Sequence, residues 1–299
     1  MKYTLRNYQK QASDAAVRLF TSKADKNGLV ILPTGAGKSL VIADIASRLE
    51  GPLLVFQPSK EILQQNFAKL QSYGIFDCGC YSASVGCKDI NRITFATIGS
   101  VMNHMSDFDC FKNIIIDECH YVNSKSGQYK QFIEAKNRQV VGLTATPYRL
   151  DRAEGGSILK FLTRVRPRIF SKVIYCCQIG ELLSKGYLAD LHYYDLTELD
   201  LRRVRSNSTG ADYDERSLLA EYERCGFYDK LSNTVVKVLQ PKSGIPRKGV
   251  LVFTAFTKEA RQLVDKLQSL GVNAAIVTGD TPKKEREAIL EGFKRREIK

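Results

Sequence analysis

The chain lacks the sequence features of secreted and membrane-spanning proteins. Its first residues, 1–6, contain no apolar core of a signal peptide. No apolar run approaches the length of about 18 residues that a transmembrane helix needs. Internal repeats and low-complexity tracts are absent as well. We therefore expect a cytoplasmic protein with no membrane partner.

The cysteines include no Cys-x-x-Cys pair, which argues against a metal-binding or redox motif. The chain has eight cysteines, scattered between Cys78 and Cys225. Small buried thiols are the ordinary state of cysteine in a reducing compartment. Cys78, Cys80 and Cys87 could supply three zinc ligands, but no fourth ligand is evident. The spacing favours reduced, buried thiols.

Acidic residues are scarce relative to basic ones. The chain has 45 Lys and Arg residues against 32 Asp and Glu residues, a formal net charge of +13. That balance favours an anionic partner, of which nucleic acid is the common one. The 43% of apolar residues is ample for packed cores. The length of 299 residues suggests about two domains.

Strand-like and helix-like stretches alternate through the first half of the chain. The strand-like runs are residues 28–33, 52–57, 92–97, 111–116 and 139–144. The helix-like stretches include residues 8–20, 38–49 and 59–71. Such alternation predicts an α/β fold with a parallel sheet and right-handed crossovers. We expect this lobe to span residues 1–165 and to bind its ligand at the carboxyl ends of the strands.

The second half is expected to contain a connector and a second, smaller lobe. Residues 166–217 form the expected connector and include a polar, arginine-rich loop after residue 199. A solvated linker is the favoured interpretation of that loop, and a nucleic-acid contact is the alternative. In residues 218–299 we expect strands at 249–254 and 273–278 and helices at 257–270 and 282–296.

A glycine turn follows the first strand-like run and opens the next helix. The turn consists of Pro33, Thr34, Gly35, Ala36, Gly37, Lys38 and Ser39. Inward-facing N–H groups and the helix N-terminus make such a turn a phosphate cradle. Lys38 can reach the β and γ phosphates, and the Ser39 hydroxyl can hold Mg²⁺. The strict pattern has glycine where Leu32 stands, so an ordinary glycine-rich turn is the alternative.

Two acids follow a second strand-like run. Residues 111–116 end at Asp117 and Glu118, which places both carboxylates at the ligand-binding edge of the sheet. Asp117 can hold Mg²⁺, and Glu118 can orient or deprotonate the attacking water. A solvated turn is the alternative. The run 139–144 ends at small hydroxyl residues, Thr144 and Thr146, which could relay between sites.

Six segments occur in the order of the motifs of superfamily-two, or DEAD/DEAH-box, helicases and resemble them. The segments are residues 5–9 (the glutamine motif), 32–39 (motif I), 56–63 (Ia), 94–100 (Ib), 117–120 (II) and 142–147 (III). Residues 248–254 and 273–280 are similar to the first segments of the family's second lobe. Residues 146–150 and 180–188 most resemble the bacterial RadD-type repair helicases, with restriction-enzyme motor subunits as the nearest alternative.

The resemblance implies a fold, cofactors and residue roles. It implies two RecA-like parallel-sheet lobes, the second incomplete at its C-terminal end, that bind ATP and Mg²⁺. Gln9 is expected to recognise adenine. Lys38, Asp117, Glu118 and His120 are the expected catalytic residues, and His120 is expected to link the site to Thr144 and Thr146. The backbone of a nucleic-acid strand is expected at Pro58, Ser59, Lys60, Thr97, Ser100, Thr254, Thr278 and Gly279.

The motifs together predict an ATP-dependent helicase or translocase that moves along a single strand in DNA repair or restriction. Single-stranded DNA is the favoured track and RNA the alternative. The chain ends before motifs V and VI, the latter of which carries an arginine finger worth about 10³ to 10⁵ in rate. A second hypothesis is therefore a truncated or split motor. It would act as an ATP-gated clamp with little hydrolysis, completed by a partner or a missing C-terminal segment. A small-molecule phosphate-loop kinase would not explain motifs Ia, Ib and III.

Overall fold

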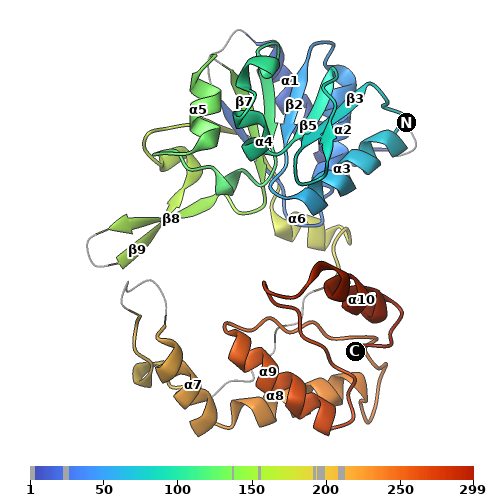
Figure 1. Ribbon diagram of the computed structural model, residues 1–299, viewed down its shortest axis with the longest axis vertical. Helices are drawn as coiled ribbons and strands as arrows, with labels where there is room; N and C mark the ends of the chain where they lie inside the picture. The colour runs from blue at the N-terminus through green and yellow to red at the C-terminus, as the bar shows by residue number, and fades with distance from the viewer. Residues whose placement is uncertain are drawn as a thin grey trace. The chain divides into compact units, whose positions relative to one another are not determined.

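The computed structural model describes residues 4–22, 27–136, 138–153, 156–190, 193, 199–207 and 213–299. The chain divides into two compact units. The first unit comprises Met1–Arg152 and Ile158–Leu191, and the second comprises Ala153–Ser157 and His192–Lys299 (Figure 1). In the part of the chain so described, no helix combines the length and apolar character that crossing a membrane requires.

An eight-stranded sheet forms the centre of the first unit. Its strand order is β10-β1-β7-β6-β2-β5-β3-β4, and every pair is parallel except β3 with β4. The strands are β1 (Gly28–Ile31), β2 (Leu53–Phe56), β3 (Cys78–Ser82), β4 (Cys87–Lys88), β5 (Ile93–Ala96), β6 (Asn113–Ile116), β7 (Gln139–Thr144) and β10 (Lys172–Cys176). The predicted α/β class with a mainly parallel sheet is confirmed, and β1, β2, β5, β6 and β7 occupy the five expected runs.

Helices cover both faces of this sheet. They are α1 (Asn7–Thr21), α2 (Lys38–Arg48), α3 (Lys60–Ser72), α4 (Ile98–Met102), α5 (Gln128–Glu134) and α6 (Ile179–Ser184), with short 3-10 turns at Met105–Phe108, Cys119–Tyr121 and Leu162–Arg164. Successive strand residues point to opposite faces. Leu53 and Val55 therefore join the core under α1, α2 and α3, whereas Leu54 and Phe56 join the core under α4 and α5. This two-sided burial explains why the strands are continuously apolar.

Residues 172–176 lie in the range expected as a connector, yet the structure places them in the sheet. They form β10, an edge strand parallel to β1, with Lys172 opposite Gly28. A Cβ atom on Gly28 would lie 2.8 Å from the Ile174 side chain, so glycine leaves the space that Ile174 fills. A two-stranded ribbon, β8 (Tyr148–Ala153) with β9 (Gly156–Phe161), precedes β10 in the chain.

The prediction of reduced thiols is wrong for Cys80 and Cys87, which form a disulfide. The antiparallel pairing of β3 with β4 sets Ser82 opposite Cys87 and brings the two cysteine Cα atoms to 5.6 Å. That separation lies within the range a disulfide requires. The pairing of β3 with β4 is a tertiary feature that cysteine spacing alone does not reveal. Cys78, the third zinc candidate, is buried and free.

Among its described residues, the second unit contains four α-helices around a small core. They are α7 (Glu215–Arg224), α8 (Phe227–Leu239), α9 (Thr257–Ser269) and α10 (Lys283–Lys294), preceded by a 3-10 turn at Leu201–Arg203. Helices α7, α8 and α9 contact one another in sequence order. Val235 of α8, Leu263 and Leu267 of α9, and Val272 form the buried centre.

The strands expected at 249–254 and 273–278 are not formed, although both runs lie among the described residues. The main chain of Lys299 lies between them. Its carbonyl accepts a hydrogen bond from the Val250 N–H at 2.6 Å, and its N–H donates to the Asn273 carbonyl at 2.9 Å. The two runs therefore do not pair with each other, and a single bridging residue is too short to build a ladder. The strand predictions are wrong for this reason.

Candidate nucleotide site

The phosphate loop lies between β1 and α2 and takes its shape from two glycines. Gly35 and Gly37 have φ angles of +81° and +80°, in the left-handed region that favours glycine. Gly37 precedes the first residue of α2, so Lys38 and Ser39 start the helix. The N–H groups of this first turn are the ones without partners inside the helix. The loop thus has the backbone of the phosphate cradle that the sequence predicts.

Two side chains of α1 fasten the loop at the carbonyl of Ala36. The Gln9 Nε2 donates to this carbonyl at 2.8 Å, and the Tyr8 hydroxyl donates to it at 2.9 Å. The Gln9 Oε1 accepts a hydrogen bond from the Arg6 N–H at 2.9 Å. Gln9, the expected adenine-recognition residue, therefore lies against the phosphate loop. The Tyr8 contact was not predicted, because the tyrosine beside Gln9 was expected only to pack into the core.

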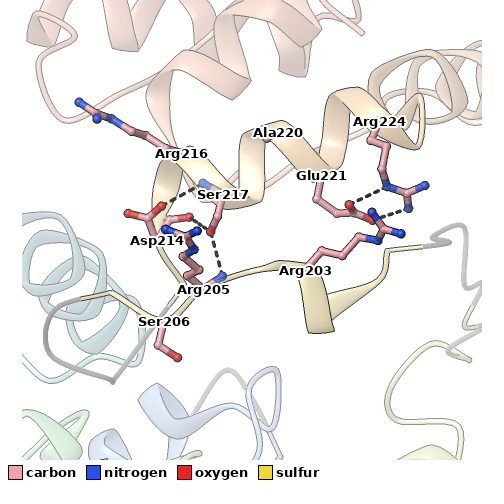
Figure 2. Close-up of a pocket in the computed structure, with 9 residues that line it drawn as sticks. All are labelled: Arg203, Arg205, Ser206, Asp214, Arg216, Ser217, Ala220, Glu221 and Arg224. Atoms are coloured by element: carbon pink, nitrogen blue, oxygen red, sulfur yellow. Dashed lines mark hydrogen bonds and ion pairs between the residues drawn. The ribbon is translucent and has the colours of Figure 1, made fainter.

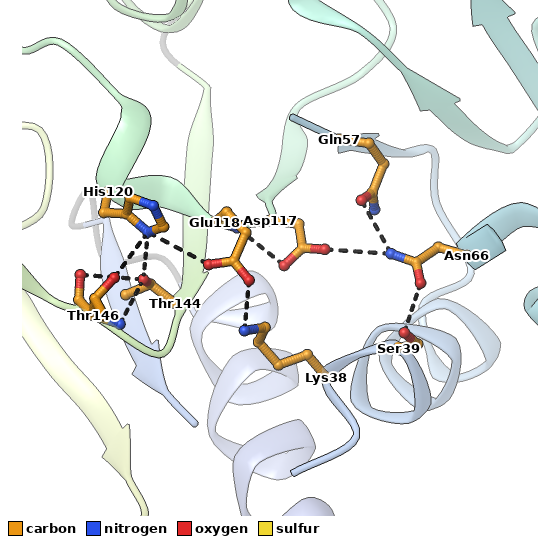
Figure 3. Close-up of polar contacts among 9 residues, drawn as sticks. All are labelled: Lys38, Ser39, Gln57, Asn66, Asp117, Glu118, His120, Thr144 and Thr146. Atoms are coloured by element: carbon orange, nitrogen blue, oxygen red, sulfur yellow. Dashed lines mark hydrogen bonds and ion pairs between the residues drawn. The ribbon is translucent and has the colours of Figure 1, made fainter. Parts of the chain in front are cut away.

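The acids of motif II lie opposite the loop (Figure 3). The Lys38 Nζ forms an ion pair with the Glu118 Oε1 at 2.7 Å. Glu118 has a φ of +48°, which is unusual for a residue with a side chain and recurs at functional sites. Its own N–H donates to the Asp117 Oδ1 at 3.0 Å. The loop lysine and the predicted catalytic carboxylate are thus in direct contact.

His120 connects these acids to the end of β7. Its Nδ1 lies 3.4 Å from the Glu118 Oε2, 2.9 Å from the Thr144 Oγ1 and 3.2 Å from the Thr146 Oγ1. Figure 3 shows the continuous series of polar contacts from Lys38 through Glu118 and His120 to the two threonines. The structure therefore places motifs I, II and III in contact, and the coupling role of His120, Thr144 and Thr146 stays a prediction.

Strand order explains this convergence. Strands β1 and β6 both lie next to β7, so the segments that follow the three strands meet at one edge of the sheet. The backbone ladder continues past the strands, since the Leu32 N–H donates to the Thr144 carbonyl and the Asp117 N–H donates to the Phe56 carbonyl, both at 3.0 Å. These bonds hold the site residues on rigid strand ends instead of on free loops.

Asp117 has an environment that opposes its charge. Its side chain is buried, and burial is the main reason that its pKa is raised to about 6. The neighbouring Glu118 charge raises the pKa further, whereas Lys38, the Glu118 N–H and Asn66 lower it. A buried carboxylate poised in this way is typical of a functional site and gains from a nearby cation.

Asn66 of α3 joins the two expected magnesium ligands. The Ser39 hydroxyl donates to the Asn66 Oδ1 at 2.6 Å, and the Asn66 Nδ2 lies 3.3 Å from the Asp117 Oδ2 and 3.0 Å from the Gln57 Oε1. One amide therefore spans Ser39 and Asp117. A hydroxyl and a carboxylate held this close suit Mg²⁺, which prefers oxygen ligands.

The sequence analysis did not identify Asn66, although a signal existed. Leu63, Asn66 and Leu70 are the buried residues of α3 and share its inward face. A polar residue at a helical spacing otherwise filled by leucine is a candidate for a buried polar role.

The residues expected to contact a nucleic-acid strand belong to both units. Ser59 caps α3, its Oγ accepting from the Ile62 N–H at 3.3 Å, and Pro58 and Lys60 flank it. The Thr97 and Ser100 hydroxyls lie 3.0 Å apart. Thr254, Thr278 and Gly279 belong to the second unit.

The fold and the site define a phosphate-loop nucleotide-binding protein with a helicase-type series of motifs. A family model described as "Type III restriction enzyme, res subunit" matches residues 2–149, and one described as "Helicase conserved C-terminal domain" matches residues 231–299. The chain belongs to the superfamily-two helicases. The RadD-type assignment is not confirmed by these matches and stays a prediction.

Curated relatives carry helicase and translocase names. The chain is 26% identical to the putative DNA 3'-5' helicase Rad25 of Haloarcula marismortui, over 100% of this chain and 44% of the relative. It is 25% identical to the DNA 3'-5' translocase XPB2 of Sulfurisphaera tokodaii, over 98% of this chain and 69% of the relative. The chain spans about half the length of the curated relatives it matches.

A solved structure shares the fold. It is Saccharomyces cerevisiae Dbp5, a variant bound to RNA and ADP BeF3, with a TM-score of 0.51 and 17% identity. The match covers 97% of this chain and 68% of Dbp5. At this identity the likeness shows the fold alone.

Proposed function

We propose that the chain is an ATP-dependent motor that moves along a single nucleic-acid strand in the cytoplasm. The observation that carries the proposal is the unbroken series of contacts from Lys38 through Glu118 and His120 to Thr144. A series of this kind can transmit the state of the nucleotide site to another part of the lobe. Single-stranded DNA is the favoured track and RNA the alternative, and repair and restriction are the two candidate settings. The names of the DNA helicase and translocase relatives support the choice of DNA.

The ion pair between Lys38 and Glu118 suggests how ATP engages the site. The γ phosphate competes with the Glu118 carboxylate for the Lys38 ammonium, and its negative charge makes the exchange favourable. Glu118, once released, can orient the attacking water and accept its proton. Ser39 and Asp117 would hold Mg²⁺, which neutralises charge on the phosphates when bound. Gln9 is proposed to recognise the adenine.

Strand contact is proposed for both lobes. The first lobe, residues 1–165, would contribute Pro58, Ser59, Lys60, Thr97 and Ser100, and the second, residues 218–299, would contribute Thr254, Thr278 and Gly279, with residues 166–217 between the lobes. Hydroxyls and backbone N–H groups suit phosphates without reading sequence, so binding should depend strongly on salt.

The second lobe is proposed to need a covering partner or further chain. Phe253 is 93% exposed and Leu251 is 68% exposed, which is unusual for a run of apolar residues. The same partner or segment would supply the arginine finger expected of motif VI, whose positive charge stabilises the transition state of ATP hydrolysis.

Steady-state ATP hydrolysis, with and without single-stranded DNA, tests the motor. Lys38→Ala should abolish strand-stimulated turnover, whereas Lys69→Ala, which changes an exposed lysine of α3, should leave it unchanged. Turnover that survives Lys38→Ala would refute the assignment of the site. Absent turnover with ATP and strand binding intact would favour the ATP-gated clamp.

A further inference from the structure

The second unit contains a pocket whose wall is dominated by arginine. The pocket has a volume of about 670 Å³ and lies beside α7 (Figure 2). Its charged lining consists of four arginines, Arg203, Arg205, Arg216 and Arg224, and two acids, Asp214 and Glu221. Arg224 pairs with Glu221, and Arg203 lies 3.5 Å from the Asp200 carboxylate, so Arg205 and Arg216 are the lining arginines without an acidic partner among the described residues. The pocket therefore has the electrostatic character of an anion site.

The two carboxylates already have partners. The Glu221 side chain is buried and accepts two hydrogen bonds from Arg224, at 2.6 and 2.8 Å, and one from the Asp200 N–H at 3.0 Å. The Asp214 Oδ1 caps α7 by accepting from the Ser217 N–H at 2.9 Å. Figure 2 shows both arrangements along the helix. Glu221 is therefore committed to Arg224, and the capping carboxylate of Asp214 contributes the remaining negative charge of the lining.

Arg205 and Arg216 have exposed side chains that make no ion pair or hydrogen bond in the part of the chain that the structure describes. The backbone of Arg205 is nevertheless fixed beside α7. Its N–H donates to the Ser217 Oγ at 3.0 Å, and its carbonyl accepts from the Asp214 N–H at 2.7 Å. Arg205 thus presents an unpaired guanidinium group from a firmly held backbone, and the second unpaired group, Arg216, extends from the first turn of α7 away from the other lining residues (Figure 2).

We propose that this arginine pocket binds the sugar–phosphate backbone of a nucleic-acid strand, as a contact additional to the motif residues. The inference rests on the proposed function and names a further site for the same partner. Guanidinium groups match phosphate oxygens in a bidentate geometry. Two of them on separate segments, beside the hydroxyls of Ser206 and Ser217, suit successive phosphates of a strand. The pocket volume far exceeds what a single phosphate group fills.

Charge-neutral substitutions test the pocket. Arg205→Gln/Arg216→Gln removes both unpaired charges, and Lys258→Gln/Arg261→Gln removes two charges from exposed residues of α9 as a matched control. Binding of a fluorescent oligothymidylate is measured by anisotropy across salt concentrations. Each single-strand phosphate contact contributes about 0.7 to the salt slope, so the pocket pair should lower the slope by about 1.4. At about 0.1 M monovalent salt the lower slope corresponds to roughly 25-fold weaker strand binding by the variant, and the affinities of variant and wild type converge as the salt concentration rises.

Further variants separate the outcomes. Arg205→Lys/Arg216→Lys keeps the charge and should keep most of the slope, and circular dichroism should show all variants folded, because the replaced side chains have no structural partner. The proposal is overturned if the pocket pair binds the strand like its matched control. A wild-type chain that binds no strand would overturn the proposed function as well. Saturation of the pocket by free tripolyphosphate, with strand binding unchanged, would assign it to a small anion and overturn the strand contact.

Discussion

Replacing Asp117 by Asn should stabilise the first unit at neutral pH while removing a residue proposed to be essential. The carboxylate is buried beside Glu118, and its pKa is raised to about 6 from the ordinary value of 3.8. The folded state therefore holds its proton more tightly than the unfolded state does. The contribution of this carboxyl group to the free energy of unfolding is at its full value below pH 3.8 and is lost as the pH rises through about 6.

The magnitude follows from the two pKa values. At pH 8 the ionised, buried carboxylate costs about 3 kcal/mol relative to a group without the raised pKa, and at pH 4.5 it costs about 1 kcal/mol. An amide at this position cannot accept both existing hydrogen bonds, from the Glu118 N–H and from Asn66, so Asp117→Asn loses about 1–2 kcal/mol at every pH. The variant should therefore be more stable than wild type by about 1–2 kcal/mol at pH 8 and no more stable at pH 4.5.

Hydrogen exchange of peptides from β6 and β7 measures this effect in the first unit alone, which matters because two units need not unfold together. The experiment is done in EDTA without nucleotide, and Asp107→Asn, at an exposed carboxylate, serves as the control. The reasoning is refuted if the difference in stability between Asp117→Asn and wild type stays constant from pH 4.5 to pH 8. It is also refuted if the variant is the less stable protein at pH 8.

Two further substitutions test the contacts around the site. Asn66→Ala removes the amide that spans the proposed magnesium ligands, so the Mg²⁺ concentration for half-maximal binding of a fluorescent ATP analogue should rise about tenfold. The control Gln64→Ala, at an exposed residue of α3, should leave that concentration unchanged. An Mg²⁺ titration of Asn66→Ala that matches wild type would contradict this role. Gly142→Ala places a Cβ atom 2.7 Å from the Cys119 Sγ, so the first unit should lose about 1–3 kcal/mol in a thermal melt. The roomier Gly99→Ala should not be destabilising, and equal melts for the two variants would disprove the packing argument.

The phosphate loop and the acid pair could be predicted from the sequence because their signals are local. Left-handed φ angles require the glycines at 35 and 37, and a β-branched run before Asp117 fixes the strand that carries it. Their convergence could also be predicted, since parallel strands end at the same edge of a sheet. The site followed from chain order without knowledge of any single contact.

Features that depend on tertiary pairing could not be predicted in the same way. Asn66 gains its role only when α3 packs beside α2, β3 and β5. The disulfide of Cys80 with Cys87 needs the register of β3 against β4. The run at 249–254 has strand composition, but the Lys299 main chain occupies the neighbouring position. The composition of a segment indicates that it can form a strand, and the segments that lie beside it in the fold determine whether the strand forms.

The position of β7 between β1 and β6 has a mechanical consequence. Strand β7 borders β1, which leads into the proposed phosphate-binding loop, and β6, which leads into the acids proposed to hold metal and activate water. A shift of the end of β7 would therefore move the loop and the acids at the same time. Substitutions in β7 should therefore change nucleotide affinity and turnover together, and variants that separate the two properties should be found on strands that border only one of them.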